Sequence, residues 1–340
     1  MVQNDAAAAV KKDMFMQGAI TYGYITLWIA LSAMVILINK YILGYTSFVF
    51  PISLTMTHMA FCAGLAALLI KLGVVSSIQM DNATYYQNVV PIAALFSGTL
   101  WLGNAAYLYL SISFIQMIKA QMPVAVFAVG TMLGTERYSN IFMSCLLVVS
   151  VGVAIASYGE IEFNMIGFLC QAGSILTESS RLCLIQILLQ SRGIKLNPVT
   201  TLYYIAPACF ACLCLPWAFI ELPVLLNTSD WEVPWFWLIA SMISAFALNM
   251  SVFLLIGRSS ALTMNVAGVV KDWLLIMLSV MLYHSIVTKL QLAGYGLSFA
   301  GVTWYNYLKM KQATPVSTQP VRVDEEKQGL LETGRESSKP

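Results

Sequence analysis

Apolar segments of about 20 residues follow one another through most of this chain, and this pattern limits its fold more than any other feature. A helix of that length spans a hydrocarbon core of about 30 Å. The 340 residues are 59% hydrophobic and only 10% charged, which excludes an ordinary soluble globular domain. The sequence therefore predicts an all-α polytopic membrane protein that lies in a lipid bilayer.

Ten transmembrane helices fit the apolar segments, with polar tails at both ends. The predicted spans are 18–43, 48–72, 89–112, 114–134, 138–158, 165–190, 198–222, 233–256, 260–283 and 286–309. Almost no loop separates the third span from the fourth at Ser111-Ile-Ser113, so nine spans is the alternative. Ten spans with both ends in the cytosol place most loop Lys and Arg residues on the cytosolic side, as the positive-inside rule requires. Residues 1–17 are then a cytosolic tail, and residues 310–340 a disordered cytosolic tail.

A weak internal repeat accompanies these spans. Sliding the chain on itself by 149 residues places Ser111 on Ser260 and superimposes the fourth and fifth spans on the ninth and tenth. The first repeat would cover residues 18–158 and the second residues 165–309. Five crossings change the side of the membrane, so two such repeats must be inverted relative to each other.

The sequence carries no constellation typical of an enzyme. Phosphate-binding Gly-rich loops, metalloprotease motifs and nucleophile elbows are all missing from it. All seven cysteines fall inside predicted spans, without metal-ligand spacing. We therefore expect no catalytic residue, no metal, no cofactor and no nucleic-acid partner.

Ionisable residues inside spans are the candidates for function, because such groups usually face a bundle interior or a water-filled cavity. They are Lys40, His58, Lys119, Glu178, Arg181, Lys271, Asp272 and His284. Lys40 lies near the end of its span and is expected to reach the headgroups. Glu178 and Arg181 are one helical turn apart and can neutralise each other. His58 and His284 each stand alone and are expected to be structural.

Lys119 and Lys271 differ from the other embedded charges. Both lie far from either membrane surface, on equivalent spans of the two repeats. Pro123 cannot donate a hydrogen bond to the carbonyl of Lys119, so a helix kink is expected beside that charge. Asp272 points about 100° away from Lys271 on a helix and could instead reach Lys119. The excess of buried positive charge predicts an anionic ligand held by the two lysines.

Several motifs resemble the nucleotide-sugar and triose-phosphate transporter family of the drug/metabolite transporter superfamily. They are Gly103-Asn104, SISFIQMIKAQMPV at 111–124, YYIAP at 203–207 and SSALTMNVAGVVKDWLLIMLSV at 259–280. The resemblance covers essentially the whole hydrophobic part of the chain. It implies the drug/metabolite transporter fold, with ten helices in two inverted five-helix repeats. It also implies exchange by alternating access and a midplane site for a phosphorylated sugar.

The resemblance also suggests a branch of the family. In the triose-phosphate branch, lysines matching Lys119 and Lys271 hold phosphate together with an arginine, and this chain has Asp272 in place of that arginine. The branch also carries His and Thr where this chain has Leu100 and Gly103. The Lys-Asp pair resembles the plant and algal "KD" subgroup, which includes Golgi carriers of UDP-arabinofuranose. The residues expected to bind substrate are Lys119, Lys271, Asp272, Asn104, Tyr107, Tyr203, Tyr204 and Asn265.

Three functions remain open at this point. The first is a Golgi antiporter that exchanges a cytosolic UDP-sugar for a lumenal nucleoside monophosphate. The second is a sugar-phosphate/phosphate translocator, and the third is a membrane scaffold or receptor that transports nothing. The Golgi membrane is favoured over the endoplasmic reticulum and the plastid envelope. Either a monomer or a homodimer is compatible with the sequence.

Overall fold

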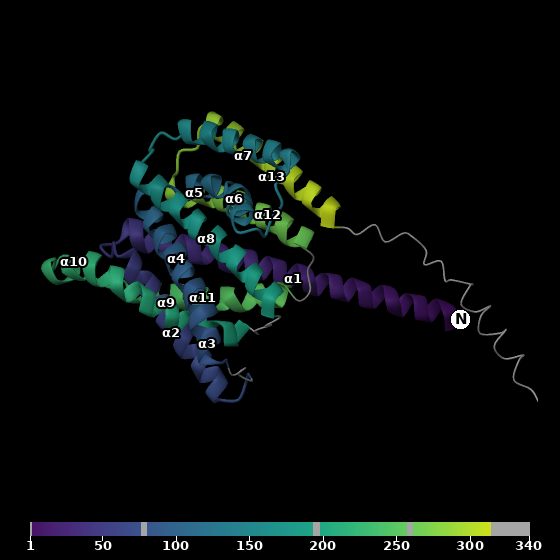
Figure 1. The fold of residues 1–340 in the computed structure, drawn as a ribbon, viewed down its shortest axis with the longest axis horizontal. Coiled ribbons are helices and arrows are strands. Elements are labelled where there is room, and N and C mark those ends of the chain that lie inside the picture. Colours follow the sequence, from purple (N-terminus) through teal and green to yellow (C-terminus); the bar gives the residue numbers. More distant parts are fainter. Residues whose placement is uncertain (1, 76–79, 193–197, 257–260, 314–340) are drawn as a thin grey trace, which may run out of the picture.

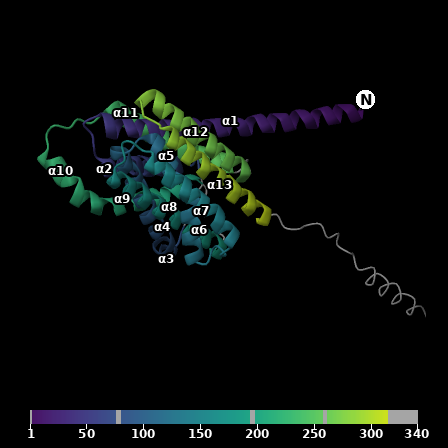
Figure 2. The ribbon, with the colours of Figure 1, turned by 90° about the horizontal axis from the view of Figure 1, so that it is seen from above.

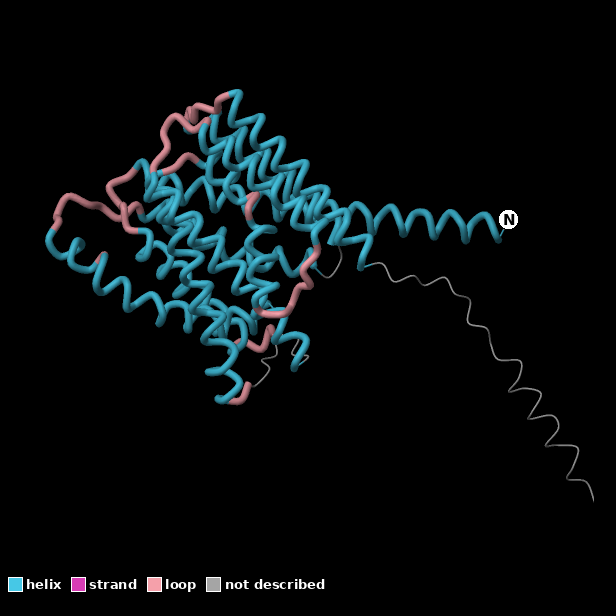
Figure 3. Tube along the Cα trace, turned by 45° about the horizontal axis from the view of Figure 1, so that its top comes forward, coloured by secondary structure: helices cyan, strands magenta, loops and turns pink. Residues whose placement is uncertain are grey.

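The computed structural model describes residues 2–75, 80–192, 198–256 and 261–313. Within these residues every regular element is a helix, and no strand occurs (Figure 3). Seven helices of this part are long and apolar enough to cross a membrane. The chain is therefore a polytopic membrane protein, as its apolar pattern predicts.

The helices follow the predicted spans closely. In chain order they are α1 (Val2–Tyr45), α2 (Pro51–Lys71), α3 (Asn82–Thr84), the π-helix η1 (Tyr85–Val89), α4 (Val90–Tyr109), α5 (Ile112–Lys119), α6 (Met122–Met132), α7 (Asn140–Tyr158), α8 (Met165–Arg192), α9 (Pro198–Ile220), α10 (Leu222–Asn227), α11 (Trp235–Ile256), α12 (Ala261–Tyr283) and α13 (Lys289–Ala313). Helix α1 begins at Val2, so it also includes most of the predicted N-terminal tail (Figure 1). Residues 314–340 of the predicted C-terminal tail lie outside the described residues.

The short join between the third and fourth predicted spans separates two helices. Helix α4 ends at Tyr109, and Leu110 adopts an extended conformation. The Ser111 hydroxyl then accepts a hydrogen bond of 3.2 Å from the Phe114 amide and caps α5. A capped helix start directly after an extended residue requires no longer loop, so α4 and α5 are separate helices at this join.

The next helix is interrupted beside Lys119, as Pro123 predicts. Helix α5 ends at Lys119, and α6 begins at Met122 with Pro123 in its first turn. Proline is favoured there because the first turn of a helix leaves its amides without intrahelical acceptors. The break places the Lys119 side chain at a helix end inside the bundle.

Helices from the two halves of the chain pack against each other in pairs. The pairs are α1 with α11, α2 with α9, α4 with α8, α5 with α12, and α7 with α13. Figures 1 and 2 both show α7 and α13 lying side by side at one edge of the bundle. The shift of 149 residues carries the start of α5 to the start of α12, and the start of α7 to that of α13.

Helices α7 and α13 approach each other at glycines. A Cβ atom on Gly152 would lie 2.5 Å from the Ser298 amide nitrogen and 2.6 Å from the Gly294 carbonyl oxygen. A Cβ atom on Gly294 would lie 2.5 Å from the Ala156 nitrogen. Small residues allow such close backbone contact between membrane helices. The Ser298 hydroxyl also donates a hydrogen bond of 3.1 Å to the Val149 carbonyl.

Polar contacts also tie this helix pair at its ends. At one end the Lys309 ammonium lies 2.5 Å from the carboxylate of Glu136, directly before α7. At the other end the Thr288 hydroxyl donates a hydrogen bond of 2.9 Å to the Gly159 carbonyl. The Gln291 amide donates to the Glu160 carboxylate beside it. Helices α7 and α13 therefore form one rigid element of the fold.

Glu221 caps the N-terminus of α2 from the segment between α9 and α10. Its carboxylate accepts hydrogen bonds from the Ile52 amide at 2.6 Å, the Ser53 amide at 2.7 Å and the Ser53 hydroxyl at 2.6 Å. A carboxylate at this position satisfies amides that have no partner within the helix. Burial raises the pKa of Glu221 above its ordinary value of 4.5, although the Ser53 and Ile52 donors oppose the shift.

Replacing Glu221 with alanine is expected to lower the free energy of unfolding by about 1–3 kcal/mol, because the α2 amides lose their buried acceptor. Thermal unfolding in detergent measures this loss, with the exposed Glu232→Ala as control.

A raised folded pKa stabilises the fold at low pH, and that stabilisation is lost as the pH rises through the folded pKa. Glu221→Gln should weaken the fall in stability above pH 4.5, but it keeps only one acceptor oxygen for these donors and should therefore lose part of the stability that the cap provides. Equal melting temperatures for Glu221→Ala and the wild type would contradict the capping role.

Candidate functional site

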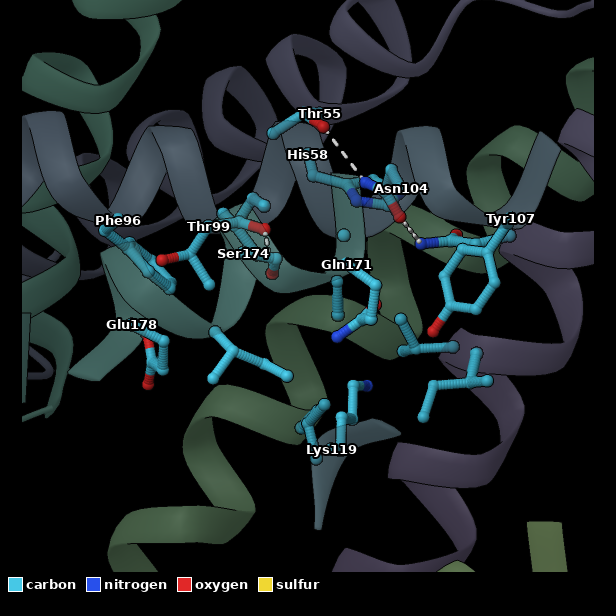
Figure 4. Close-up of a pocket in the computed structure, with 18 of the residues that line it drawn as sticks. Thr55, His58, Phe96, Thr99, Asn104, Tyr107, Lys119, Gln171, Ser174 and Glu178 are labelled. Atoms are coloured by element: carbon cyan, nitrogen blue, oxygen red, sulfur yellow. Dashed lines mark hydrogen bonds between the residues drawn. The ribbon is translucent and has the colours of Figure 1, made fainter. Parts of the chain in front are cut away.

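A cavity of about 420 Å³ lies between α1, α2, α4, α8, α11 and the break between α5 and α6. Figure 4 shows its polar side chains arranged around a common space. The polar residues that line it are Asn39, Thr55, His58, Thr99, Asn104, Tyr107, Lys119, Gln171, Ser174, Glu178 and Asn249. Both halves of the chain contribute, so the helix pairs described above form the walls.

A second cavity of about 330 Å³ also borders the helix break and is otherwise lined by α12 and α13. Its charged lining residues are Lys119, Asp272 and Lys309. Lys119 thus lines both cavities, which is possible because α5 ends at this residue. A ligand in either cavity can contact the same ammonium group.

Lys119 carries a charge that the surrounding protein leaves unbalanced. Within the part of the chain that the structure describes, Lys119 forms no ion pair within 4.0 Å and no hydrogen bond with its side chain. In Figure 4 its ammonium points towards the middle of the main cavity. An unpaired cation in a membrane bundle favours an anionic ligand, because burying an isolated charge is costly.

Lys271 and Asp272 pair with each other, contrary to the expectation that they point apart. The Lys271 ammonium lies 3.3 Å from the Asp272 carboxylate and 5.7 Å from the centre of the Trp28 ring. Asp272 lines the second cavity with Lys119, but no ion pair joins these two side chains. Lys271 lines neither cavity. The pair therefore presents little net charge to a ligand, whereas Lys119 is a lysine of both cavity linings that forms no ion pair with a described residue.

Glu178 and Arg181 form the expected pair on one face of α8. The guanidinium donates to the carboxylate at 2.8 and 2.5 Å, a bidentate arrangement. Arg181 also lies over the Phe96 ring at 4.7 Å. Glu178 lines the main cavity, but its charge is balanced by Arg181.

Lys40 binds within the protein, and the expectation that it reaches the headgroups is wrong. Its ammonium donates hydrogen bonds of 2.7 Å to the Tyr107 carbonyl and 2.9 Å to the Leu110 carbonyl. These carbonyls belong to the C-terminal end of α4, where a cation interacts favourably with the helix dipole. Lys40 thus caps α4 and fixes it against α1.

Asn104 lies in the cavity wall as part of a buried hydrogen-bond network. Its carbonyl oxygen accepts a hydrogen bond of 3.2 Å from Asn39, and its amide donates one of 3.0 Å to Thr55. Ser241 donates to Asn39 at 2.5 Å, so the network joins α1, α2, α4 and α11. Tyr107 is also in the wall, and its hydroxyl points into the cavity in Figure 4. Asn104 is therefore placed to orient helices, and Tyr107 to contact a ligand.

Two of the other three predicted residues lie outside these cavities. Tyr203 and Tyr204 line neither of them. Their rings pack together with Tyr85 at one end of the bundle, and the Tyr204 hydroxyl accepts a hydrogen bond of 3.3 Å from the Met80 amide. Asn265 lies on α12 but outside the residues whose side chains the structure describes.

Gln171 was not among the predicted site residues, and His58 was expected to be structural. Gln171 on α8 is 1% exposed, and neither its amide nitrogen nor its carbonyl oxygen has a hydrogen-bond partner in the protein. His58 on α2, expected to be structural, also lines the cavity and leaves its Nε2 atom unpaired. A search restricted to charged residues overlooks Gln171, although a carboxamide in an apolar span is itself a signal.

Comparisons with known proteins agree with a transport site of this kind. Residues 20–306 match the model of the Triose-phosphate Transporter family. Two Arabidopsis thaliana proteins, each described as a probable sugar phosphate/phosphate translocator, are 50% and 48% identical to the chain. These alignments cover 94% and 95% of this chain, and 92% and 94% of the relatives.

Two more distant similarities are to a nucleotide-sugar transporter and to a protein of known structure. The UDP-galactose transporter 1 of Arabidopsis thaliana is 28% identical, over 85% of this chain and 87% of its own length. A protein of known crystal structure is 15% identical, with a TM-score of 0.51, over 88% of this chain and 99% of its own. At that identity the likeness concerns the fold alone.

Proposed function

Because the chain belongs to the Triose-phosphate Transporter family, whose members are transporters and not enzymes, we propose that it exchanges a nucleotide sugar for a nucleoside monophosphate. A UDP-sugar is the favoured substrate. The observation that carries the proposal is the unpaired Lys119 ammonium, which lines a cavity containing uncharged hydrogen-bonding groups. Such a cavity suits a ligand that has both phosphate and neutral polar parts.

The charges around Lys119 favour a diphosphate ester over a phosphate monoester. A phosphate monoester carries a charge of about −1.5 to −2 on one phosphorus near pH 7. In a nucleotide sugar each of the two phosphates carries a single negative charge. Lys119 is one cation, and Asp272 lines the second cavity beside it. A dianion concentrated on one phosphorus near that carboxylate would be repelled more strongly than a spread charge, so the returning nucleoside monophosphate is expected to bind less tightly than the nucleotide sugar.

Alternating access is the mechanism that we propose. Lys119 lines two cavities that border the break in a helix, and discontinuous helices commonly form the substrate sites of transporters. The cross-half helix pairs and the matching helix starts support two inverted five-helix repeats. Rocking of one repeat against the other would then expose Lys119 to each side of the membrane in turn.

The relatives favour two substrates, and so a second candidate remains. The descriptions of the two more similar relatives favour sugar-phosphate/phosphate exchange. The UDP-galactose transporter and the Lys271-Asp272 pair, which resembles the "KD" subgroup, favour a UDP-sugar such as UDP-arabinofuranose. The Golgi membrane is the location that accompanies the favoured substrate.

Counter-exchange in vesicles separates these candidates. The protein is reconstituted in vesicles preloaded with UMP, GMP, CMP or inorganic phosphate, and the uptake of a panel of nucleotide sugars and sugar phosphates is measured. Uptake of a UDP-sugar into UMP-loaded vesicles is the expected result. Uptake of sugar phosphates into phosphate-loaded vesicles alone would replace the first candidate with the second. No exchange with any pair would favour a scaffold or receptor.

Removing the Lys271 charge should weaken exchange because it leaves Asp272 unpaired beside the second cavity. We expect Lys271→Ala to slow exchange by about tenfold or more, since an unpaired carboxylate repels the anionic substrate. The double variant Lys271→Ala/Asp272→Ala restores neutrality and should recover part of the loss. Initial exchange rates of the single and double variants measure this coupling. If the loss of exchange in the double variant equals the sum of the losses in the two single variants, the ion pair has no such role.

Asn227 tests the orientation of the chain in the membrane. It lies exposed at the end of α10 in an Asn-Thr-Ser sequon, on the side that the charge distribution predicts to be lumenal. We expect glycosylation at Asn227 and none at Asn82, whose sequon is predicted to be cytosolic. Treatment with an endoglycosidase should therefore shift the wild-type band on a gel but not that of Asn227→Gln. Glycan at Asn82 would show the opposite orientation.

A further inference from the structure

Gln171 is a hydrogen-bonding group without a partner in the wall of the main cavity. Its side chain is 1% exposed, and neither its amide nitrogen nor its carbonyl oxygen has a hydrogen-bond partner among the described residues. In Figure 4 its amide end points towards Lys119 and the middle of the cavity. Buried polar groups are almost always hydrogen-bonded, so a carboxamide that is doubly unpaired requires an explanation.

Most other polar groups of this wall are already occupied. Asn104 bonds to Asn39 and Thr55, and the Ser174 hydroxyl donates a hydrogen bond of 2.9 Å to the Thr99 carbonyl. His58 resembles Gln171 instead, because it is 6% exposed and its Nε2 atom has no partner within the protein. Gln171 and His58, from α8 and α2, are therefore the open positions opposite the Lys119 ammonium (Figure 4).

The chemistry of these two side chains differs from that of Lys119. A carboxamide offers one acceptor and two donors side by side, and it carries no charge. It pairs best with a group that presents a donor next to an acceptor. The imide edge of uracil and two neighbouring hydroxyls of a sugar are both such groups. A phosphodiester or a fully deprotonated phosphate monoester offers only acceptors, so it would leave the Gln171 carbonyl oxygen unpaired.

We propose that Gln171 and His58 form a specificity subsite for the uncharged part of the transported molecule, while Lys119 holds its phosphate. The subsite binds an edge with adjacent donor and acceptor, from either the base or the sugar. This inference rests on the proposed transport function, and it adds the residues that select among molecules carrying the same phosphate. A site built to hydrogen-bond a substrate rejects analogues that lack the bonding group.

The decisive variant is Gln171→Met, which keeps an unbranched side chain and removes both hydrogen-bonding groups. UMP, ribose 5-phosphate and inorganic phosphate are compared as competitors of exchange, because they share a phosphate and differ in the uncharged part. We expect Gln171→Met to weaken competition by UMP about tenfold to a hundredfold, as the loss of one or two hydrogen bonds implies. Competition by inorganic phosphate should not change. If competition by both UMP and ribose 5-phosphate is weakened, Gln171 binds the sugar hydroxyls. If competition by UMP alone is weakened, Gln171 binds the base.

Gln116 provides a matched control within the same bundle. It is also 1% exposed and unpaired at both amide atoms, but it lines neither cavity. Gln116→Met should therefore leave competition by every compound unchanged. Without ligand, both Met variants should unfold at or above the wild-type temperature, because each removes an unpaired buried amide. His58→Phe is the second test of the subsite and should weaken the same competitors as Gln171→Met.

Two results would overturn the subsite. One is unchanged competition by every compound in both Gln171→Met and His58→Phe. The other is an equal loss of competition by UMP, ribose 5-phosphate and inorganic phosphate. Failure of the proposed function has a different signature, since the wild-type protein would then respond to ribose 5-phosphate and phosphate but not to UMP. A selective loss of ribose 5-phosphate in Gln171→Met would still support the subsite in that case.

Discussion

Replacing Lys119 with alanine is expected to reduce exchange by about tenfold to a hundredfold or more. The ammonium lines both cavities, and no carboxylate of the described part pairs with it. A hydrogen bond to a charged group is worth about 1.5–3 kcal/mol, which corresponds to a change of about tenfold to a hundredfold in binding. Initial rates of counter-exchange in reconstituted vesicles measure the loss.

Two controls make the Lys119 result specific. Lys119→Arg keeps the charge and should retain part of the activity, although the guanidinium differs in shape. Lys309→Ala removes a lysine that lines the second cavity but is paired with Glu136, so its effect on exchange should be smaller. All three variants should unfold near the wild-type temperature. Normal exchange by Lys119→Ala would remove Lys119 from the site.

Replacing Gly152 with leucine is expected to cost at least about 3 kcal/mol of stability, or to prevent folding altogether. Even the first side-chain carbon would lie 2.6 Å from the Gly294 carbonyl oxygen on the facing helix. The Ser298 amide nitrogen, at 2.5 Å, is a backbone atom like the Gly294 carbonyl oxygen, so relief requires α13 itself to move away from α7. Thermal unfolding in detergent and the elution profile of the purified variant check this expectation.

Gly296 is the matched control for the close helix contact. It lies on α13, two residues from Gly294, and a Cβ atom there would meet nothing within 4 Å. Gly296→Leu should therefore fold and transport almost normally, and its effect on helix propensity is favourable. If Gly152→Leu and Gly296→Leu melted at the same temperature, close packing between α7 and α13 would not be what holds this pair together.

The helices could be predicted from the sequence because each one depends on local properties. A run of about 20 apolar residues is sufficient for a span, whatever its neighbours are. The break at Lys119 follows from the missing amide of Pro123, and the start of α5 follows from the Ser111 cap. Glu178 and Arg181 pair because three residues separate them on one helix.

The partners of the other embedded charges depend on packing between distant segments. Lys40 meets carbonyls that lie 67 and 70 residues away in the sequence. Asp272 turns towards Lys271, although helix geometry alone separates their directions. Tyr203 and Tyr204 belong to a motif that resembles the family, yet their rings pack at one end of the bundle.

The sequence by itself determined that this chain crosses a membrane many times, and it predicted that Lys119 binds an anion. Both conclusions follow from the cost of exposing polar groups to lipid, which each segment incurs independently. Only the tertiary structure decided that Lys119 stays unpaired, that it lines two cavities, and that Gln171 faces it. These depend on which helix faces meet across the bundle, and one sequence without its contacts does not specify that choice.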